Sequence, residues 1–267
     1  MIRRLALLAA LLAPLAAHAF TLDAPVEQGR LIRGQTSPKA TILLDGKKLP
    51  VSPEGKFVFG LARDATGTIT LTENDTASVL PIAPRAWDIQ RIEGLPPGKV
   101  NPDPEGLKRI QREAALIKAA RSQVTDLGGF VEAFRWPANG RISGIYGSQR
   151  ILNGEPRAPH LGLDIAGPTG TVIRAPASGR VVLAEPDLFF TGRTVMIDHG
   201  HGVGSIFAHL SASSVTVGQV ITAGQEIGAV GATGRVTGPH LHWGVYWGAV
   251  TLDPLPLMPT PVPPPLP

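Results

Sequence analysis

The residues best suited to chemistry in this sequence are four histidines and an aspartate in three short segments. The segments are Pro159-His-Leu-Gly-Leu-Asp164, Phe207-Ala-His-Leu-Ser211 and Gly238-Pro-His-Leu-His-Trp243. His160 and Asp164 alternate with apolar residues, so an extended strand would present both on one face. The same alternation puts His240 and His242 on one face of a second strand. Two strands therefore each offer a pair of nitrogen or oxygen ligands.

This set of side chains has the composition of a hydrolytic zinc site. Catalytic zinc usually takes three protein ligands of histidine or carboxylate type and keeps a fourth position open for water. His160, Asp164 and one of His240 and His242 would supply the three ligands, and spacing alone does not decide which. The other histidine of that pair and His209 would then transfer protons or stabilise charge on the attacked carbonyl. A structural zinc site would favour cysteine, and the chain has none.

Four segments together carry a resemblance to a known family. They are His160-Leu-Gly-Leu-Asp-Ile-Ala-Gly-Pro-Thr-Gly-Thr171, Ile197-Asp-His-Gly-His-Gly202, Phe207-Ala-His-Leu-Ser211 and Gly231-Ala-Thr-Gly-Arg-Val-Thr-Gly-Pro-His-Leu-His-Trp243. In this order they resemble the M23 zinc endopeptidases of the LytM or lysostaphin type, over about half of the chain. The resemblance implies that one Zn²⁺ is bound by His160, Asp164 and His242. It also implies that His209 and His240 are catalytic histidines that do not bind the metal.

The resemblance further implies a substrate, the peptide stems of peptidoglycan. For an exported enzyme without a wall-anchoring repeat, we expect hydrolysis of the bond from D-alanine to meso-diaminopimelate in a Gram-negative periplasm. Some relatives have lost ligands and act as silent regulators that bind other wall hydrolases, which is the alternative function. This sequence keeps all five matched positions. A regulatory protein could bind through the N-terminal domain or the linker helix.

Residues 1–19 are typical of a cleaved signal peptide. Arg3 and Arg4 precede an apolar run, and Ala17-His-Ala19 is a small-residue cleavage pattern. The run is shorter than the ~20 residues of a membrane span, so no stable span is expected. The whole chain has 25 Lys and Arg against 21 Asp and Glu, and without Arg3 and Arg4 the balance is 23 against 21. A net charge of +2, with no basic run interleaved with aromatic residues, argues against nucleic acid as a partner.

The fold is expected to be mainly β, with two domains that depend on core burial alone because cysteine is absent. Residues 20–84 contain short apolar runs separated by turn residues, a pattern typical of a small immunoglobulin-like sandwich. This unit could present a partner surface, cover the catalytic groove or act as a spacer. Residues 85–133 form a linker, in which Trp87 is expected to dock on a domain surface. An amphipathic helix is predicted over residues 105–123, with Leu107, Ile110, Ala114 and Ile117 on its apolar stripe.

Residues 134–254 are predicted to form the M23-type domain, an antiparallel sheet with a ligand-lined groove, followed by an extended proline-rich tail at 255–267. Residues 148–159 are expected to be a loop bordering that groove. His199 and His201 lie in a glycine-containing turn and are expected to face water. Strand alternation with Phe207 is expected to turn His209 away from the core and into the groove.

Overall fold

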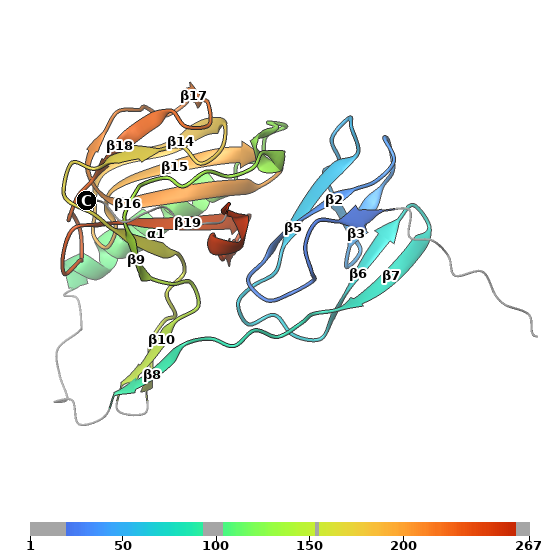
Figure 1. The fold of residues 1–267 in the computed structure, drawn as a ribbon, viewed down its shortest axis with the longest axis horizontal. Helices are drawn as coiled ribbons and strands as arrows, with labels where there is room; N and C mark the ends of the chain where they lie inside the picture. Colours follow the sequence, from blue (N-terminus) through green and yellow to red (C-terminus); the bar gives the residue numbers. More distant parts are fainter. Residues whose placement is uncertain (1–19, 93–103, 153–154, 260–267) are drawn as a thin grey trace, which may run out of the picture.

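The structure is a computed structural model that describes residues 20–92, 104–152 and 155–259 (Figure 1). The predicted signal peptide and most of the predicted extended tail lie outside the described residues. Where the tail is described, it begins with a turn of 3-10 helix, Leu255–Leu257, and is therefore not extended from its start.

The N-terminal domain is a sandwich of two antiparallel sheets. One sheet has the order β1-β2-β5 and the other β4-β3-β6-β7. The strands are β1 (Thr21–Leu22), β2 (Leu31–Gln35), β3 (Ile42–Leu44), β4 (Lys47–Leu49), β5 (Lys56–Gly60), β6 (Thr68–Glu73) and β7 (Thr76–Pro81). Asp45 and Gly46 have φ of 48° and 78° between β3 and β4, which suits a tight hairpin turn. Ile32 and Phe57 from one sheet meet Ile42 and Leu71 from the other in a common core.

Strand β2 is buried on both faces. Ile32 points into the sandwich core, whereas Leu31 belongs to the core of the C-terminal domain. Strand β5 is divided in the same way, with Phe57 and Phe59 in the sandwich and Val58 in the other core. A strand covered on both sides loses the alternation of apolar and polar residues that marks a half-buried strand. The two domains therefore share buried apolar residues.

The C-terminal domain is built on a ten-stranded sheet whose main path is β17-β14-β15-β16-β19-β12-β9. The strands are β9 (Arg141–Gly144), β12 (Leu163–Ala166), β13 (Val172–Arg174), β14 (Gly179–Leu188), β15 (Gly192–Gly200), β16 (Val203–Ser213), β17 (Val220–Ile221), β18 (Glu226–Val230), β19 (His240–Trp247) and β20 (Val250–Leu252). All pairings within it are antiparallel. One face of β19 buries Leu241, Trp243 and Val245 in the domain core. The predicted mainly β fold with an antiparallel sheet is confirmed.

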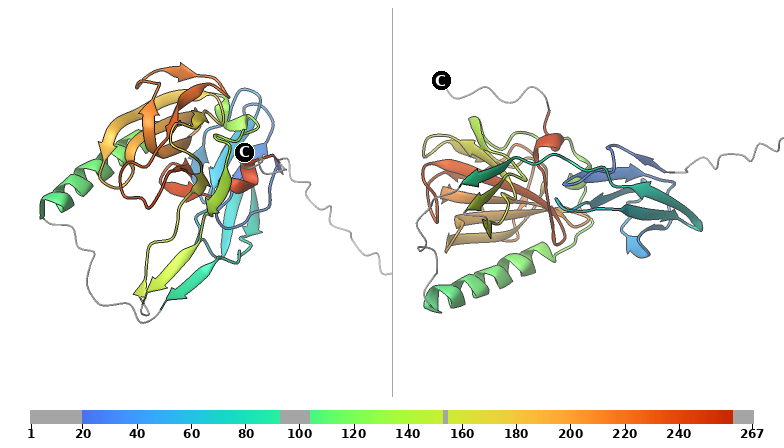
Figure 2. Two further views of the ribbon diagram at one scale, coloured as in Figure 1. Left: turned by 60° about the vertical axis from the view of Figure 1, so that its left-hand side comes forward. Right: turned by 90° about the horizontal axis from the view of Figure 1, so that it is seen from below.

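Helix α1 (Pro104–Arg121) lies along the C-terminal sheet (Figure 2). Ala120 is buried and Ile117 partly buried against Met196 and Tyr246. The predicted apolar stripe is wrong at its N-terminal end, because Leu107 is 47% exposed, and at Ala114, which is also exposed. Polar contacts hold the helix there, including an Arg109–Asp187 ion pair of 3.0 Å and a hydrogen bond from the Phe189 amide to Glu113. No helix in the described ranges has both the length and the hydropathy to cross a membrane.

The predicted loop at 148–159 is wrong in its first half and at 155–156. Strand β10 (Gln149–Leu152) pairs in parallel with β8 (Ile89–Ile92) of the linker and antiparallel with β11 (Glu155–Pro156). The pair of strands β8 and β10 extends away from the body of the domain in Figure 1. The partner strand is about 60 residues distant in sequence, and such non-local pairings leave no local signal.

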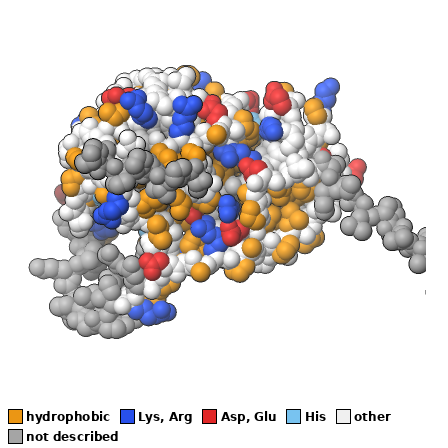
Figure 3. Space-filling view, in the orientation of Figure 1, with side chains coloured by type: hydrophobic (Ala, Val, Ile, Leu, Met, Phe, Trp, Pro, Cys, Tyr) orange, Lys and Arg blue, Asp and Glu red, His pale blue; other side chains and the backbone are white. Residues whose placement is uncertain are grey.

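The domain interface lies at the end of β19 remote from His240. A Cβ at Gly60 of β5 would lie 2.9 Å from the Leu252 side chain and 3.1 Å from that of Trp247, so the Gly60 backbone lies directly against these two side chains. Arg85 of the linker forms a 2.7 Å ion pair with Asp253. On the face shown in Figure 3, basic and acidic side chains are interspersed across both domains. The sandwich is thus docked beyond Trp247 rather than over the histidine end of the strand.

Candidate metal centre

Strand register brings two of the predicted ligands together. In the antiparallel pair of β12 and β19, Asp164 lies opposite His242, and Ala166 lies opposite His240. His160 precedes β12 by three residues and folds back onto the same face. Glycines leave room for this approach, because a Cβ at Gly144 would lie 2.5 Å from Asp164 Oδ2 and one at Gly162 would lie 2.6 Å from His242 Cε1.

Three donor atoms converge on one point. His160 Nε2 lies 3.1 Å from both Asp164 Oδ1 and His242 Nδ1, and those two atoms are 2.9 Å apart. Ligands at 2.0–2.2 Å from a tetrahedral ion lie about 3.3–3.5 Å from one another, so this triangle would expand only slightly to hold an ion. All three side chains are partly buried. The geometry therefore fits one metal ion held by two imidazoles and a carboxylate.

The Asp164 carboxyl is held in its ionised form, which suits a bound cation. His160 Nδ1 lies 3.0 Å from the Ile145 carbonyl oxygen, which directs the lone pair of Nε2 toward the other two ligands. Burial alone would raise the pKa of Asp164, but the hydrogen bonds and charges of His160 and His242 together hold that pKa well below its usual range. Burial alone would lower the pKa of His160, but the hydrogen bond and charge of Asp164 outweigh it and raise that pKa above its usual value. The carboxylate is therefore ionised and the site is electron-rich.

His209 reaches the centre through a bulge in β16. In the ladder to β19, Phe207 lies opposite the core residue Trp243, and Ala208 lies opposite His242. Strict alternation would put His209 on the core side with Phe207, so the predicted reason for its orientation is wrong. His209 instead has a φ of 66°, and the register of β16 against β15 shifts by one residue there. Its ring lies 4.9 Å from that of His240 and 6.1 Å from that of His242, centroid to centroid.

His209 and His240 present similar nitrogens to the centre. His209 Nδ1 lies 2.9 Å from the Thr233 carbonyl oxygen, and His240 Nδ1 lies 2.9 Å from that of Gly238. Each Nδ1 therefore donates to main chain, which leaves Nε2 as the ring nitrogen available for chemistry. The Nε2 atom of His240 is 3.8 Å from Asp164 Oδ1, outside the ligand triangle. Burial lowers the pKa of His209 to about 4, so this ring is neutral near pH 7 and can accept a proton.

The main-chain acceptors at Ile145, Thr233 and Gly238 were not predicted. A carbonyl oxygen has no side-chain signature, so only the nearby glycines hinted at them. At Gly192, for example, a Cβ would lie 2.3 Å from Thr233 Oγ1. The loop that orients His209 is therefore packed too closely for a larger residue at that position.

His199 and His201 were predicted to face water, but both are buried, at 0% and 4% exposure. His199 Nδ1 lies 2.9 Å from the Ser178 carbonyl oxygen and Nε2 lies 2.9 Å from Ser205 Oγ. Trp243 Nε1 donates to the same hydroxyl. His201 stacks on Phe130, with 4.2 Å between ring centroids. The glycines of this turn do adopt positive φ, but the side chains turn inward because the segment containing Phe130 covers them.

Buried neutral His199 makes stability depend on pH. Burial lowers its pKa to about 4, whereas an unfolded histidine titrates near 6.5. Between those values the unfolded chain binds a proton that the folded chain excludes, so stability falls as pH decreases through this window. From pH 7.5 to 5 this amounts to about 2 kcal/mol. Urea unfolding at both pH values should show a smaller decrease for His199→Gln than for wild type; equal decreases would contradict the assignment.

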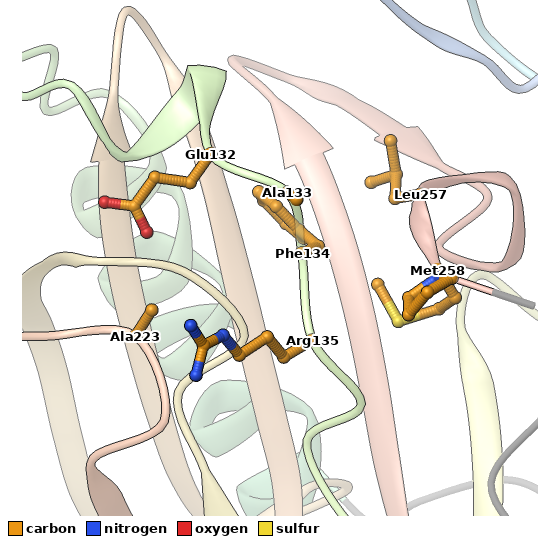
Figure 4. Close-up of a pocket in the computed structure, with 8 residues that line it drawn as sticks. Glu132, Ala133, Phe134, Arg135, Ala223, Leu257 and Met258 are labelled. Atoms are coloured by element: carbon orange, nitrogen blue, oxygen red, sulfur yellow. The ribbon is translucent and has the colours of Figure 1, made fainter.

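The pocket in Figure 4 is separate from this centre. It is lined by Glu132, Ala133, Phe134, Arg135, Ala223, Leu257, Met258 and Pro259. None of the five predicted site residues contributes to it. In the described part of the chain, the group of His, Asp or Glu donors close enough to share an ion is His160, Asp164 and His242.

Comparison with known proteins gives the family. Residues 158–254 match the model described as Peptidase family M23. The chain is 44% identical over 103 residues to the DD-carboxypeptidase/endopeptidase Mpg of Neisseria meningitidis serogroup B, covering 38% of this chain and 24% of that protein. It is 40% identical over 112 residues to the peptidoglycan DD-endopeptidase ShyA of Vibrio cholerae serotype O1, covering 41% and 26%. The match thus spans about a quarter of the length of these curated relatives.

A solved structure extends the likeness to both domains. It is the crystal structure of an M23 peptidase candidate from Pseudomonas aeruginosa, 30% identical, with a TM-score of 0.66. The match covers 88% of this chain and 95% of that one. Since this relative is matched over nearly its full length and the family model spans the metal centre, the chain belongs to peptidase family M23.

Proposed function

We propose that the protein is a zinc metalloendopeptidase that hydrolyses peptide crosslinks of peptidoglycan. The observation that carries the proposal is the 3 Å triangle of His160, Asp164 and His242 with the rings of His209 and His240 beside it. A purely structural zinc site would close all four positions with protein ligands. Three ligands and two further histidines are the composition of a hydrolytic site.

The ligand set favours zinc among divalent metals. Two imidazoles with one carboxylate suit zinc in a tetrahedral arrangement, whereas magnesium and calcium prefer oxygen ligands. When bound there, zinc would lower the pKa of a coordinated water and polarise the scissile carbonyl. The protein's own contribution is to hold the three donors rigidly. Asp164 and His242 are fixed by direct strand pairing, and His160 by its hydrogen bond to Ile145.

The two other histidines divide the proton transfers. His209, neutral because its burial disfavours the charged form, accepts the proton of the attacking water through Nε2. His240, whose Nδ1 is tied to Gly238, stabilises the tetrahedral intermediate or relays to the leaving amine the proton that His209 accepted. Each such group typically contributes ~10²- to 10⁴-fold to the rate.

The substrate is proposed from the relatives and the predicted compartment. Mpg and ShyA carry names that specify DD-endopeptidases, which supports the bond from D-alanine to meso-diaminopimelate. The predicted signal peptide at 1–19 supports action in the periplasm. A silent regulator of another wall hydrolase would need no complete ligand set, so the intact triangle favours the enzyme.

Digestion of purified sacculi tests this proposal. We expect the zinc-loaded protein to release monomeric muropeptides from crosslinked dimers, because hydrolysis of the crosslink separates the two stems. A chelator should abolish the release and added zinc should restore it. Mass spectrometry of the products identifies the bond. Zinc bound at one ion per chain with no cleavage of any crosslink would instead indicate the regulator.

A further inference from the structure

Residues 145–148, here called the His160 support, hold the first metal ligand by three hydrogen bonds. His160 Nδ1 donates to the Ile145 carbonyl at 3.0 Å. The Gly147 amide donates to the His160 carbonyl at 2.8 Å, and the His160 amide donates to the Ser148 carbonyl at 2.8 Å. Both the main chain and the ring of His160 are thus oriented by this segment.

Arg63 of the N-terminal domain forms a hydrogen bond to the His160 support. It follows β5, is 8% exposed, and donates from Nε to the Gly147 carbonyl at 3.0 Å. Its Nη1 donates to Asp64 at 2.6 Å, and its Nη2 lies 3.4 Å from Gln149 Oε1. Burial of a guanidinium is unfavourable unless its N–H groups donate to acceptors, and hydrogen bonds from a charged donor are stronger than those from a neutral one. The contact joins residues 84 positions apart.

Trp87 of the linker fills the space beneath the same segment. Its ring meets Tyr146 edge to face at 5.7 Å, and the guanidinium groups of Arg63 and Arg85 lie over it at 5.2 and 4.6 Å. The docking predicted for this tryptophan is confirmed. Gly147 has a φ of 84°, and a Cβ there would lie 2.1 Å from the Trp87 ring. The support therefore rests on the indole at a position that only glycine can occupy.

The far end of this cluster is anchored to β20 and to the residue that follows it. The Tyr146 hydroxyl donates to the Thr251 carbonyl at 2.9 Å. Arg85 pairs with Asp253, whose side chain is 5% exposed. A continuous set of buried and partly buried contacts thus connects the sandwich and the linker to the backbone that orients His160.

We propose that Arg63 and Trp87 are positioning residues for the metal centre. By fixing the His160 support, they keep Nε2 of His160 aimed at the point shared by Asp164 and His242. This inference rests on the proposed function, since it assumes that His160 binds the metal. It gives the N-terminal domain a role other than groove cover, partner surface or spacer. Losing a residue that orients a ligand typically lowers metal affinity 10- to 100-fold.

The test compares two interdomain arginines in the full chain. Arg63→Ala should weaken zinc binding about 10-fold, measured by competition with a chromophoric chelator. Arg33→Ala is the matched control. Arg33 also reaches from the sandwich to the C-terminal domain, where it donates to the carbonyls of Phe130 and Glu132, but it makes no contact with the support. It should bind zinc within about 2-fold of wild type.

A second readout separates positioning from general destabilisation. The visible spectrum of the cobalt-substituted protein reports ligand geometry, so it should change in Arg63→Ala and remain unchanged in Arg33→Ala. Arg63→Lys, which keeps the charge but not the Nε contact, serves if the alanine variant does not fold. Equal zinc affinities for the Arg63 variant and wild type, or equal losses in the Arg63 and Arg33 variants, would overturn the proposal. Failure of the proposed function is distinct, since wild type would then bind zinc no better than His160→Ala.

Discussion

Changing His240 to alanine is expected to reduce turnover ~10²- to 10⁴-fold while leaving zinc bound. The Nε2 atom of His240 lies 3.8 Å from Asp164 Oδ1, beside the ligand triangle rather than in it. The substitution therefore removes a group that handles charge or protons without removing a ligand. Muropeptide turnover and the zinc content of the same sample measure the two effects separately.

Thr237→Ala is the matched control for His240→Ala. Thr237 is exposed in the loop that leads into β19, so its loss tests whether any change in that loop disturbs turnover. We expect Thr237→Ala to retain wild-type activity. A His240→Ala protein that cleaves muropeptides at the wild-type rate would remove His240 from the mechanism, and one that loses zinc would move it into the ligand set.

Changing His160 to alanine is expected to abolish stoichiometric zinc binding. Its Nε2 atom is one of three donors, and the remaining two, Asp164 and His242, leave half of a tetrahedral site to solvent. The loss of affinity should exceed the ~10- to 100-fold seen when only an orienting residue is removed. Elemental analysis after dialysis against a weak chelator measures zinc per chain, and activity should fall to that of chelated wild type.

Leu161→Ala controls for damage to the local backbone around His160. Leu161 is 38% exposed, so its truncation should leave zinc at one ion per chain. If His160→Ala kept a full complement of zinc through the same dialysis, the proposed ligand set would be wrong. His160→Ala and His240→Ala thus form a pair, since only the first is expected to lose metal.

The sequence could predict the paired strands of the centre because their signal is local. Alternation along 240–247 puts His240 and His242 on one face, and the register of β12 against β19 aligns Asp164 with His242. The predicted strand begins too early, because β12 starts at Leu163 and His160 reaches the centre from the segment before it. His209 shows where local reasoning ends. Its orientation depends on a positive φ and a shifted register, and neither is visible in the alternation of Phe207 and Leu210.

Long-range contacts account for the other errors. Burial of His199 and His201 depends on Phe134 and Phe130, which come from a segment about 65 to 70 residues earlier. The β8–β10 pair and the Arg63 contact with Gly147 are likewise non-local. Such contacts form only when the chain has assembled, so residue type and spacing carry little information about them.

Leu31 and Val58 lie in a core that belongs to the other domain. Unfolding of the sandwich alone would expose part of that core to water. Unfolding of the C-terminal sheet alone would expose the side chains of Leu31 and Val58. Separating the two domains would therefore expose apolar surface on both of them. A shared core of this kind couples the two halves into one cooperative unit, which a calorimeter registers as a single heat-absorption peak.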